Sequence, residues 1–214
     1  MNKVRWGIIG CGDVCEVKSG PGFYKADHSE LTIVMRRNGE KAADFAKRHN
    51  VEQSTNNADE VIYHPKVDAV YIATPPSSHC EYALKVAEAG KPCYVEKPMA
   101  MNHRECVQMI DAFKSKNIPL YVAYYRRALP RFLKVRDLLR EGAIGTLTSA
   151  HIVQYGKLSK NPNNWRYDPS VAGAGQFLDV GSHGLDILDF LVSPITRASG
   201  FALNTGGTYK AEDV

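Results

Sequence analysis

The sequence has no apolar run that approaches the roughly 18 residues of a membrane-spanning helix. Its first residues, MNKVRWGIIG, enter an apolar strand at once and lack the basic, apolar and small-residue order of a secretion signal. The five cysteines form no CxxC pair and lie in or beside apolar stretches, which is typical of free thiols in a reducing compartment. We therefore expect a cytoplasmic protein that is neither exported nor embedded in a membrane.

Long runs of lysine or arginine are also missing, although 27 basic residues outnumber 23 acidic residues and leave a net charge of +4. A small surplus of basic residues that are scattered along the chain does not form the continuous basic surface that binds a phosphate backbone, so we expect no nucleic-acid partner. No internal repeat or low-complexity tract occurs. A composition of 44% hydrophobic and 23% charged residues over 214 positions is that of a globular chain with one large domain or two small ones.

What the chain does contain is an alternation of short β-branched runs with longer helical patterns. Strand and helix taking turns predicts βαβ units and a parallel sheet, hence an α/β fold. Strands are expected at 4–9, 31–34, 67–73, 93–95 and 120–124, with helical segments up to residue 24 and at 40–50, 79–90 and 103–117.

The rhythm changes after Tyr125. A helix is expected from Pro130 to Gly142, then a strand at 147–155, a long loop at 157–175 and an apolar helix at 175–191. We place a domain boundary near Val122, which gives a dinucleotide-binding domain at 1–122 and a second α+β domain at 123–214.

A glycine motif, Gly10-x-Gly12-x-x-Cys15, follows the first strand and opens a helix. In a dinucleotide fold the first glycine makes the tight turn and the second lets backbone amides approach the pyrophosphate. Cys15 departs from the usual Gly or Ala at the third position. We expect Gly10, Gly12, Asp13 and Val14 to contact a cofactor, and a tight turn without a ligand is the alternative.

The residues after the second strand bear on the choice of cofactor. An acid there binds the ribose of NAD, whereas an arginine accommodates the 2′-phosphate of NADP. Arg36 and Arg37 follow this strand, and no acid occurs before Glu40. This favours NADP over NAD, and two solvated surface arginines are the alternative.

Two further segments follow strands and so belong at the carboxyl edge of the sheet, where open α/β folds bind ligands. ATPPSSH contributes Thr74, Pro75 and Pro76, and VEKPMA contributes Glu96 and Lys97. A third segment, GQFLDVGSHGLDILDFL, spaces Asp179, His183 and Asp186 along one face of an otherwise apolar helix.

Taken together, GIIGCGDV, ATPPSSH, VEKPMA, YYRRALP, EGAIG and GAGQFLDVGSHGLD closely resemble the glucose-fructose oxidoreductase and inositol dehydrogenase family, also called Gfo/Idh/MocA. The resemblance implies a Rossmann domain followed by a domain with an open antiparallel sheet, and hydride transfer between NAD(P) and a sugar, polyol or cyclitol. It implies Lys97, Asp179 and His183 as the catalytic residues. The cofactor contacts it implies include Thr74, Pro75, Pro76, His79, Glu96, Lys97 and Arg126, and Tyr125, Trp165 and Arg166 are candidates for the substrate. Pro98 resembles a proline that commonly follows a cis peptide bond.

The chemistry suits these residue types. Removing hydride from a carbinol requires the hydroxyl proton to leave, and histidine serves best as a base near neutral pH. We expect His183 to be that base, Lys97 to stabilise the developing alkoxide, and Asp179 to orient the imidazole or to bind a substrate hydroxyl.

The chain departs from the family in length, since members run roughly a hundred residues longer. Its tail, FALNTGGTYKAEDV, resembles the start of the second-domain sheet and includes the pair Glu212 and Asp213. We expect an incomplete second domain, and a homo-oligomer when the protein is full length. A dinucleotide-binding sensor without turnover is one alternative. A metal-dependent hydrolase that uses Asp179, His183 and Asp186 is another, although no His or Cys cluster supplies further ligands.

Overall fold

The computed structural model describes residues 3–154, 156, 161, 164–207 and 209–213. The chain divides into two compact units, residues 1–123 and 124–214. Within the described ranges, no helix is long and apolar enough to cross a membrane.

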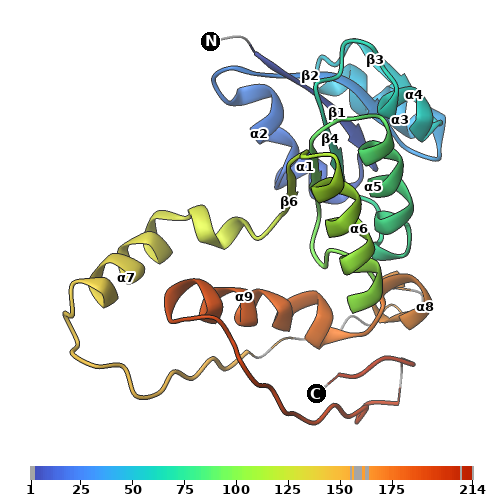
Figure 1. Cartoon of the computed structure of the whole chain (residues 1–214). Helices are drawn as coiled ribbons and strands as arrows, with labels where there is room; N and C mark the ends of the chain where they lie inside the picture. The colour runs from blue at the N-terminus through green and yellow to red at the C-terminus, as the bar shows by residue number, and fades with distance from the viewer. Residues whose placement is uncertain (1–2, 155, 157–160, 162–163, 208, 214) are drawn as a thin grey trace. The chain divides into compact units, whose positions relative to one another are not determined.

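The first unit is built on one parallel sheet in the order β3-β2-β1-β4-β5-β6 (Figure 1). This is the strand order of a Rossmann dinucleotide-binding fold, and the predicted α/β class is confirmed. The strands are β1 Val4–Ile9, β2 Ser29–Met35, β3 Gln53–Thr55, β4 Ala69–Ile72, β5 Cys93–Val95 and β6 Leu120–Val122.

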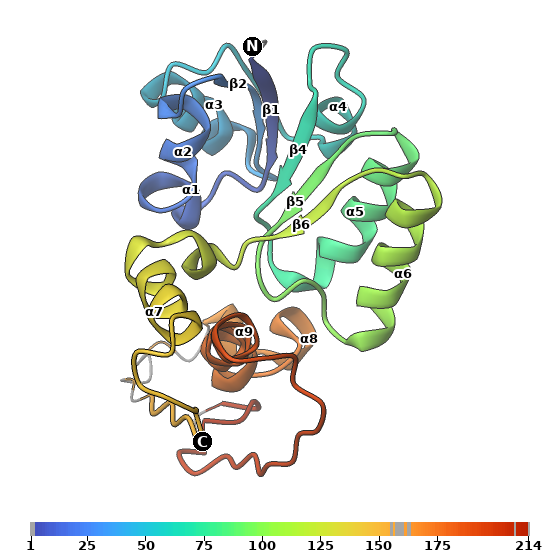
Figure 2. The same cartoon turned by 60° about the vertical axis from the view of Figure 1, so that its left-hand side comes forward.

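Helices cover both faces of this sheet (Figure 2). Neighbouring residues of β1 point to opposite faces, so Ile8 packs with Phe45 below α1–α3, whereas Ile9 packs with Phe113 below α4–α6. The helical elements are α1 Asp13–Val17, α2 Gly20–Lys25, α3 Gly39–Arg48, α4 Ala58–Ile62, η1 Pro76–Ser78, α5 His79–Glu88 and α6 His103–Ser115.

Local sequence explains where several of these helices begin and end. Asn38, Asn57 and Asn102 each precede a helix and accept a hydrogen bond from an amide in its first turn. Gly90 follows Ala89, the C-cap of α5, and has φ +73°, in the left-handed region that glycine tolerates, so it ends that helix as predicted. The sequence pattern missed β3 and α4, because a three-residue polar strand and a five-residue helix are too short to show a period.

The elements of the second unit are all helical, and no strand is assigned among its described residues. The predicted strand at 147–155 is therefore wrong over 147–154, and residue 155 lies outside the described residues. A strand exists only where a neighbour pairs with it, and the apolar pattern does not reveal whether one is present. The elements are η2 Tyr125–Ala128, α7 Pro130–Arg140, η3 Trp165–Tyr167, α8 Pro169–Ala172, a π-helical turn Phe177–Gly181 and α9 Ser182–Leu191.

Candidate functional site

The candidate site of the first unit begins at the turn after β1, where Gly10 has φ +94°. The amides of Gly10 and Cys11 donate to the carbonyl of Met35 at 2.8 and 3.0 Å. A Cβ on Gly10 would lie 2.8 Å from the backbone nitrogen of Thr74. Both the backbone conformation and the close approach of the loop after β4 therefore require glycine here.

Gly12 differs, because a Cβ built on it meets nothing nearer than the Gly10 carbonyl oxygen at 3.9 Å. The space beside Gly12 is open, which fits the close backbone approach that a pyrophosphate makes to the second glycine. Asp13 is exposed and Val14 half-buried at the start of α1. Cys15 is fully buried under the turn, and this burial raises the pKa of its thiol to about 12. Cys15 thus packs α1 onto the sheet as a small neutral side chain.

Glu16 ties α1 to the end of α3. Its carboxylate accepts from Arg48 Nη1 and Nη2 at 2.8 and 2.6 Å, and it lies 2.9 Å from His49 Nε2. Hydrogen bonding by Arg48 lowers the pKa of Glu16 to about 2, with a further contribution from His49. The ion pair therefore holds the helix that carries the glycine motif.

We expect Glu16→Gln to lower the midpoint of urea unfolding at pH 7 and to leave the midpoint nearly unchanged near pH 2. A depressed pKa contributes stability that is fully present above the unfolded value of 4.5 and is lost as the pH falls towards 2. Urea titrations of both proteins across this window test the expectation. The exposed Glu52→Gln is the matched control. A difference in urea midpoint between Glu16→Gln and the original chain that stays the same at every pH would contradict the expectation.

Arg36 and Arg37 stand at the carboxyl end of β2, as the sequence predicts. The Arg36 amide donates to the carbonyl of Thr55 at 3.2 Å, which fixes the backbone beside β3. Burial raises the pKa of the Cys11 thiol to about 11, and the positive charge of Arg36 opposes this rise. Arg36 directly follows Met35, whose carbonyl accepts from the glycine turn, so the Arg36 backbone lies beside that turn. The Arg36 side chain is half-buried, whereas the Arg37 side chain is exposed.

Thr74, Pro75 and Pro76 follow β4 at the same edge of the sheet, and His79 is fully buried behind them. His79 Nε2 lies 2.7 Å from the Thr74 carbonyl, and its Nδ1 lies 3.0 Å from the Pro98 carbonyl. Burial lowers the pKa of this imidazole. His79 has no exposed surface with which to contact a cofactor, so the predicted direct contact is corrected to a brace between the loops after β4 and β5.

Glu96 and Lys97 follow β5 and are both half-buried. The Glu96 carboxylate accepts from the Tyr71 hydroxyl at 2.6 Å and from the Lys97 amide at 3.1 Å. The Tyr71 hydroxyl also lies 2.9 Å from Ser19 Oγ, between α1 and α2. Burial and the Glu96 charge raise the pKa of Tyr71. This network, which the sequence pattern missed, fixes the loop that carries Lys97, and the Lys97–Pro98 peptide bond is cis.

The candidate site of the second unit is the π-helical turn and α9. Asp179 lies in the π turn, and His183 lies in the first turn of α9, where it is 6% exposed. The rings of Tyr124 and Tyr125 both meet the imidazole edge-on, with centroids 5.8 and 5.5 Å away. The site candidate Tyr125 is therefore brought to His183, and Arg126 is half-buried beside it in η2.

Arg166 is brought to Asp179. Its Nε lies 3.7 Å from Asp179 Oδ2, and its guanidinium covers the Trp165 ring with 4.5 Å from Cζ to the centroid. Both side chains of the ion pair are partly exposed, so the pair is open to a polar ligand. The two loop residues predicted as substrate contacts thus lie beside one predicted catalytic residue.

Asp186, which had a sequence-based role only in the metal-hydrolase alternative, binds Arg127. Arg127 Nε donates to the buried Oδ1 of Asp186 at 2.7 Å, and its guanidinium also reaches Asp189 and the ring of Phe190. The pair fastens η2, and with it Tyr124 and Tyr125, to α9. Asp186 is therefore engaged by a guanidinium, and no group of three or more His, Cys, Asp or Glu among the described residues is placed to hold a metal.

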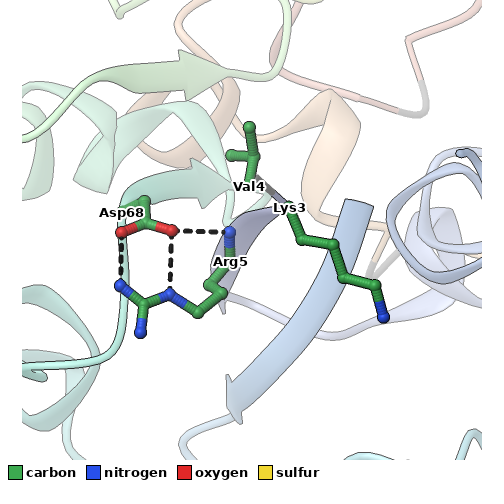
Figure 3. Close-up of a pocket in the computed structure, with 4 residues that line it drawn as sticks. All are labelled: Lys3, Val4, Arg5 and Asp68. Atoms are coloured by element: carbon green, nitrogen blue, oxygen red, sulfur yellow. Dashed lines mark hydrogen bonds and ion pairs between the residues drawn. The ribbon is translucent and has the colours of Figure 1, made fainter. Parts of the chain in front are cut away.

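A hollow at the opposite end of the sheet is lined by Lys3, Val4, Arg5 and Asp68 (Figure 3). Arg5 binds both carboxylate oxygens of Asp68 there, at 2.9 Å from Nε and 2.7 Å from Nη2. This hollow lies at the start of β1, away from the glycine turn. It is therefore not the edge at which Rossmann folds bind dinucleotides.

Comparisons with known proteins agree with this organisation. Residues 4–124 match the family described as "Oxidoreductase family, NAD-binding Rossmann fold", and residues 132–214 match the GFO/IDH/MocA C-terminal domain. Oxidoreductase P35 of Formosa agariphila is 46% identical over 87% of this chain and 60% of its own length. Levoglucosan dehydrogenase of Pseudarthrobacter phenanthrenivorans is 37% identical over 78% of this chain and 44% of its own length.

A solved structure of levoglucosan dehydrogenase in complex with NADH and levoglucosan aligns with a TM-score of 0.74 and 33% identity. The alignment covers 90% of this chain and 54% of that one. The chain thus spans about half the length of the relatives it matches, and it belongs to the Gfo/Idh/MocA oxidoreductase family.

Proposed function

We propose that this chain is part of an NAD(P)-dependent oxidoreductase that transfers hydride between the nicotinamide cofactor and a sugar, polyol or cyclitol. The observation that carries the proposal is the π turn and helix of the second unit, which hold Asp179 beside Arg166 and His183 in edge contact with the rings of Tyr124 and Tyr125. Membership of the family and the sugar named for the levoglucosan dehydrogenase support the substrate class.

The first unit supplies the cofactor side of this proposal. Its glycine turn has the open face at Gly12 that a pyrophosphate needs, and Arg36 directly follows Met35, whose carbonyl accepts from the amides of that turn. When bound, the nicotinamide supplies the hydride chemistry. Lys97 stabilises negative charge on the substrate oxygen, and the bonds to Glu96 keep the backbone of its loop in place.

The second unit supplies the residue that transfers the proton. His183 accepts the hydroxyl proton during oxidation and returns it during reduction. Arg166 and Trp165 offer a guanidinium and an aromatic face to a hydroxylated ligand, and Asp179 accepts hydrogen bonds from its hydroxyls. We further propose that the full-length protein is a homo-oligomer, as the family resemblance implies.

Turnover of a panel of polyols, cyclitols and ketoses tests the function. The panel is run with NADP⁺ and NAD⁺ for the alcohols and with NADPH and NADH for the ketones, and absorbance of the reduced nicotinamide is followed. We expect at least one sugar or cyclitol to be oxidised or reduced. Tight cofactor binding without turnover of any compound by the intact coding sequence would favour the sensor instead.

We also propose that NADP is preferred over NAD, and Arg36 and Arg37 carry this preference. Changing both to alanine is expected to weaken NADPH binding by about tenfold to a hundredfold, because hydrogen bonds to a charged group contribute about 1.5–3 kcal/mol. NADH binding is expected to stay within a factor of about two, since NADH has no 2′-phosphate. Fluorescence titration measures both affinities. The exposed Arg104→Ala is the control, and equal affinities of the original chain for NADH and NADPH would refute the preference.

A further inference from the structure

Glu212 binds the start of the helix that carries Asp179 and His183. Its Oε2 accepts from the Gly175 amide at 2.6 Å, and its Oε1 accepts from the Phe177 amide at 2.8 Å. The Glu212 carbonyl accepts from the Gln176 amide between them at 3.3 Å. One residue thus satisfies three consecutive amides that a helix start leaves without partners inside the helix.

The next residue, Asp213, fixes the backbone from which Glu212 reaches this helix. Asp213 accepts from the amides of Thr205 and Gly206, at 2.7 Å each, and its own amide donates to the Leu203 carbonyl at 2.9 Å. These amides hold the pKa of Asp213 below its usual range. Two adjacent carboxylates therefore bind two different stretches of backbone. Asp213 binds residues 203–206, and Glu212 joins this part of the chain to the start of the helix.

Glu212 packs so closely against Gly175 that no side chain fits between them. A Cβ on Gly175 would lie only 2.1 Å from the Glu212 carbonyl oxygen and 2.9 Å from its Oε2. The Gly175 carbonyl in turn accepts from the Asp179 amide at 3.1 Å. Asp179 is thus one backbone hydrogen bond away from the residue that Glu212 holds.

The π turn that begins at these amides determines how Asp179 is oriented. Phe177–Gly181 winds as a π-helix, a form that is rare and that recurs as single turns at functional sites. A Cβ on Gly181 would lie 2.9 Å from the Phe177 ring, so the turn is also packed tightly against itself. The orientation of Asp179 relative to His183 depends on keeping this turn, and Glu212 binds the amides from which it begins.

We propose that Glu212 is a positioning residue, which fixes the π turn and thereby the alignment of Asp179 with His183. Glu212 acts through the helix start and touches neither substrate nor cofactor. The inference rests on the proposed function for its effect on turnover, but its structural part stands on the described contacts alone.

The test combines amide exchange with steady-state kinetics on the full chain. Glu212→Ala is expected to speed hydrogen exchange at Gly175 and Phe177, measured by NMR. It is also expected to lower kcat by about 10- to 100-fold with little change in KM for the cofactor, because small misplacements at reacting groups cost about this much. Glu212→Gln retains one acceptor oxygen and is expected to recover part of both losses. Glu141→Ala, at the exposed end of α7, is the matched control.

Gly175→Ala provides a second approach, since its Cβ displaces Glu212 while leaving the carboxylate intact. We expect it to reproduce the Glu212→Ala defect, and the double variant to be no worse than either single one. Unchanged exchange at Gly175 and Phe177 in Glu212→Ala would overturn the inference whether or not turnover is found. Altered exchange together with wild-type kcat would also overturn it. Failure of the original chain to turn over any sugar would reject the proposed function, while the exchange measurement still decides whether Glu212 holds the turn.

Discussion

His183→Ala is expected to lower kcat for the sugar identified in the panel by about 10²- to 10⁴-fold, the usual contribution of a general base or acid. The imidazole is held in one place, because it is 6% exposed and two tyrosine rings meet its edges. Alanine cannot accept the hydroxyl proton, and water reaches such a buried position poorly. KM for the cofactor is expected to stay within about threefold, since the change removes an interaction made only during proton transfer. Stopped-flow and steady-state absorbance of the reduced nicotinamide measure both constants.

The matched control is His151→Ala, which makes the same change at an exposed histidine of the same unit. Lys97→Ala is the companion variant for the first unit, with the exposed Lys114→Ala as its own control. We expect His183→Ala to keep cofactor affinity close to the original value, and both catalytic variants to keep the thermal unfolding midpoint close to the original. Turnover that survives both His183→Ala and Lys97→Ala would reject the roles assigned to these residues.

The sequence was sufficient to predict the fold where signals are local. Alternating β-branched and helical runs predicted five of the strands, and Gly90 marked the end of α5. The pattern failed at β3, because Gln53–Thr55 is held by pairing with β2 rather than by its own side chains. It failed again at 147–154, where an alternating apolar run predicted a strand that has no pairing partner among the described residues.

For the candidate site too, the sequence indicated the residues but not the contacts that hold them. The sequence pattern located Lys97 after a strand and Asp179 and His183 in the segment of the last helix. Their catalytic roles were implied by the family resemblance and stay proposals. The contacts around them were not predictable, because they join residues that are distant in sequence. Arg127 and Asp186 are separated by 59 positions, and Tyr71 and Glu96 by 25. His79 looked like a ligand contact within its motif, and only its complete burial between two carbonyls showed that it is a brace.

Replacing the two glycines of the β1 turn with alanine is expected to give opposite results for stability and for binding. Gly10→Ala forces a side chain into φ +94° and against the Thr74 backbone, so we expect the free energy of unfolding to fall by about 1–3 kcal/mol. Gly12→Ala adds a Cβ on the open side, where backbone φ is −99° and alanine is tolerated. We expect its free energy of unfolding to stay within about 0.5 kcal/mol of the original.

Gly12→Ala is nevertheless expected to weaken NADPH binding by about tenfold or more, because the added methyl occupies the space through which the pyrophosphate approaches the backbone. Urea unfolding and fluorescence titration of the same two proteins separate the effects, and each variant serves as the control for the other. If Gly12→Ala binds NADPH as tightly as the original chain, the cofactor does not approach at this turn. If Gly10→Ala unfolds at the original midpoint, the contact with Thr74 relaxes without cost and the turn is less constrained than its φ indicates. A stable Gly12→Ala that no longer binds NADPH would link the open face of the turn to the cofactor without relying on any measurement of turnover.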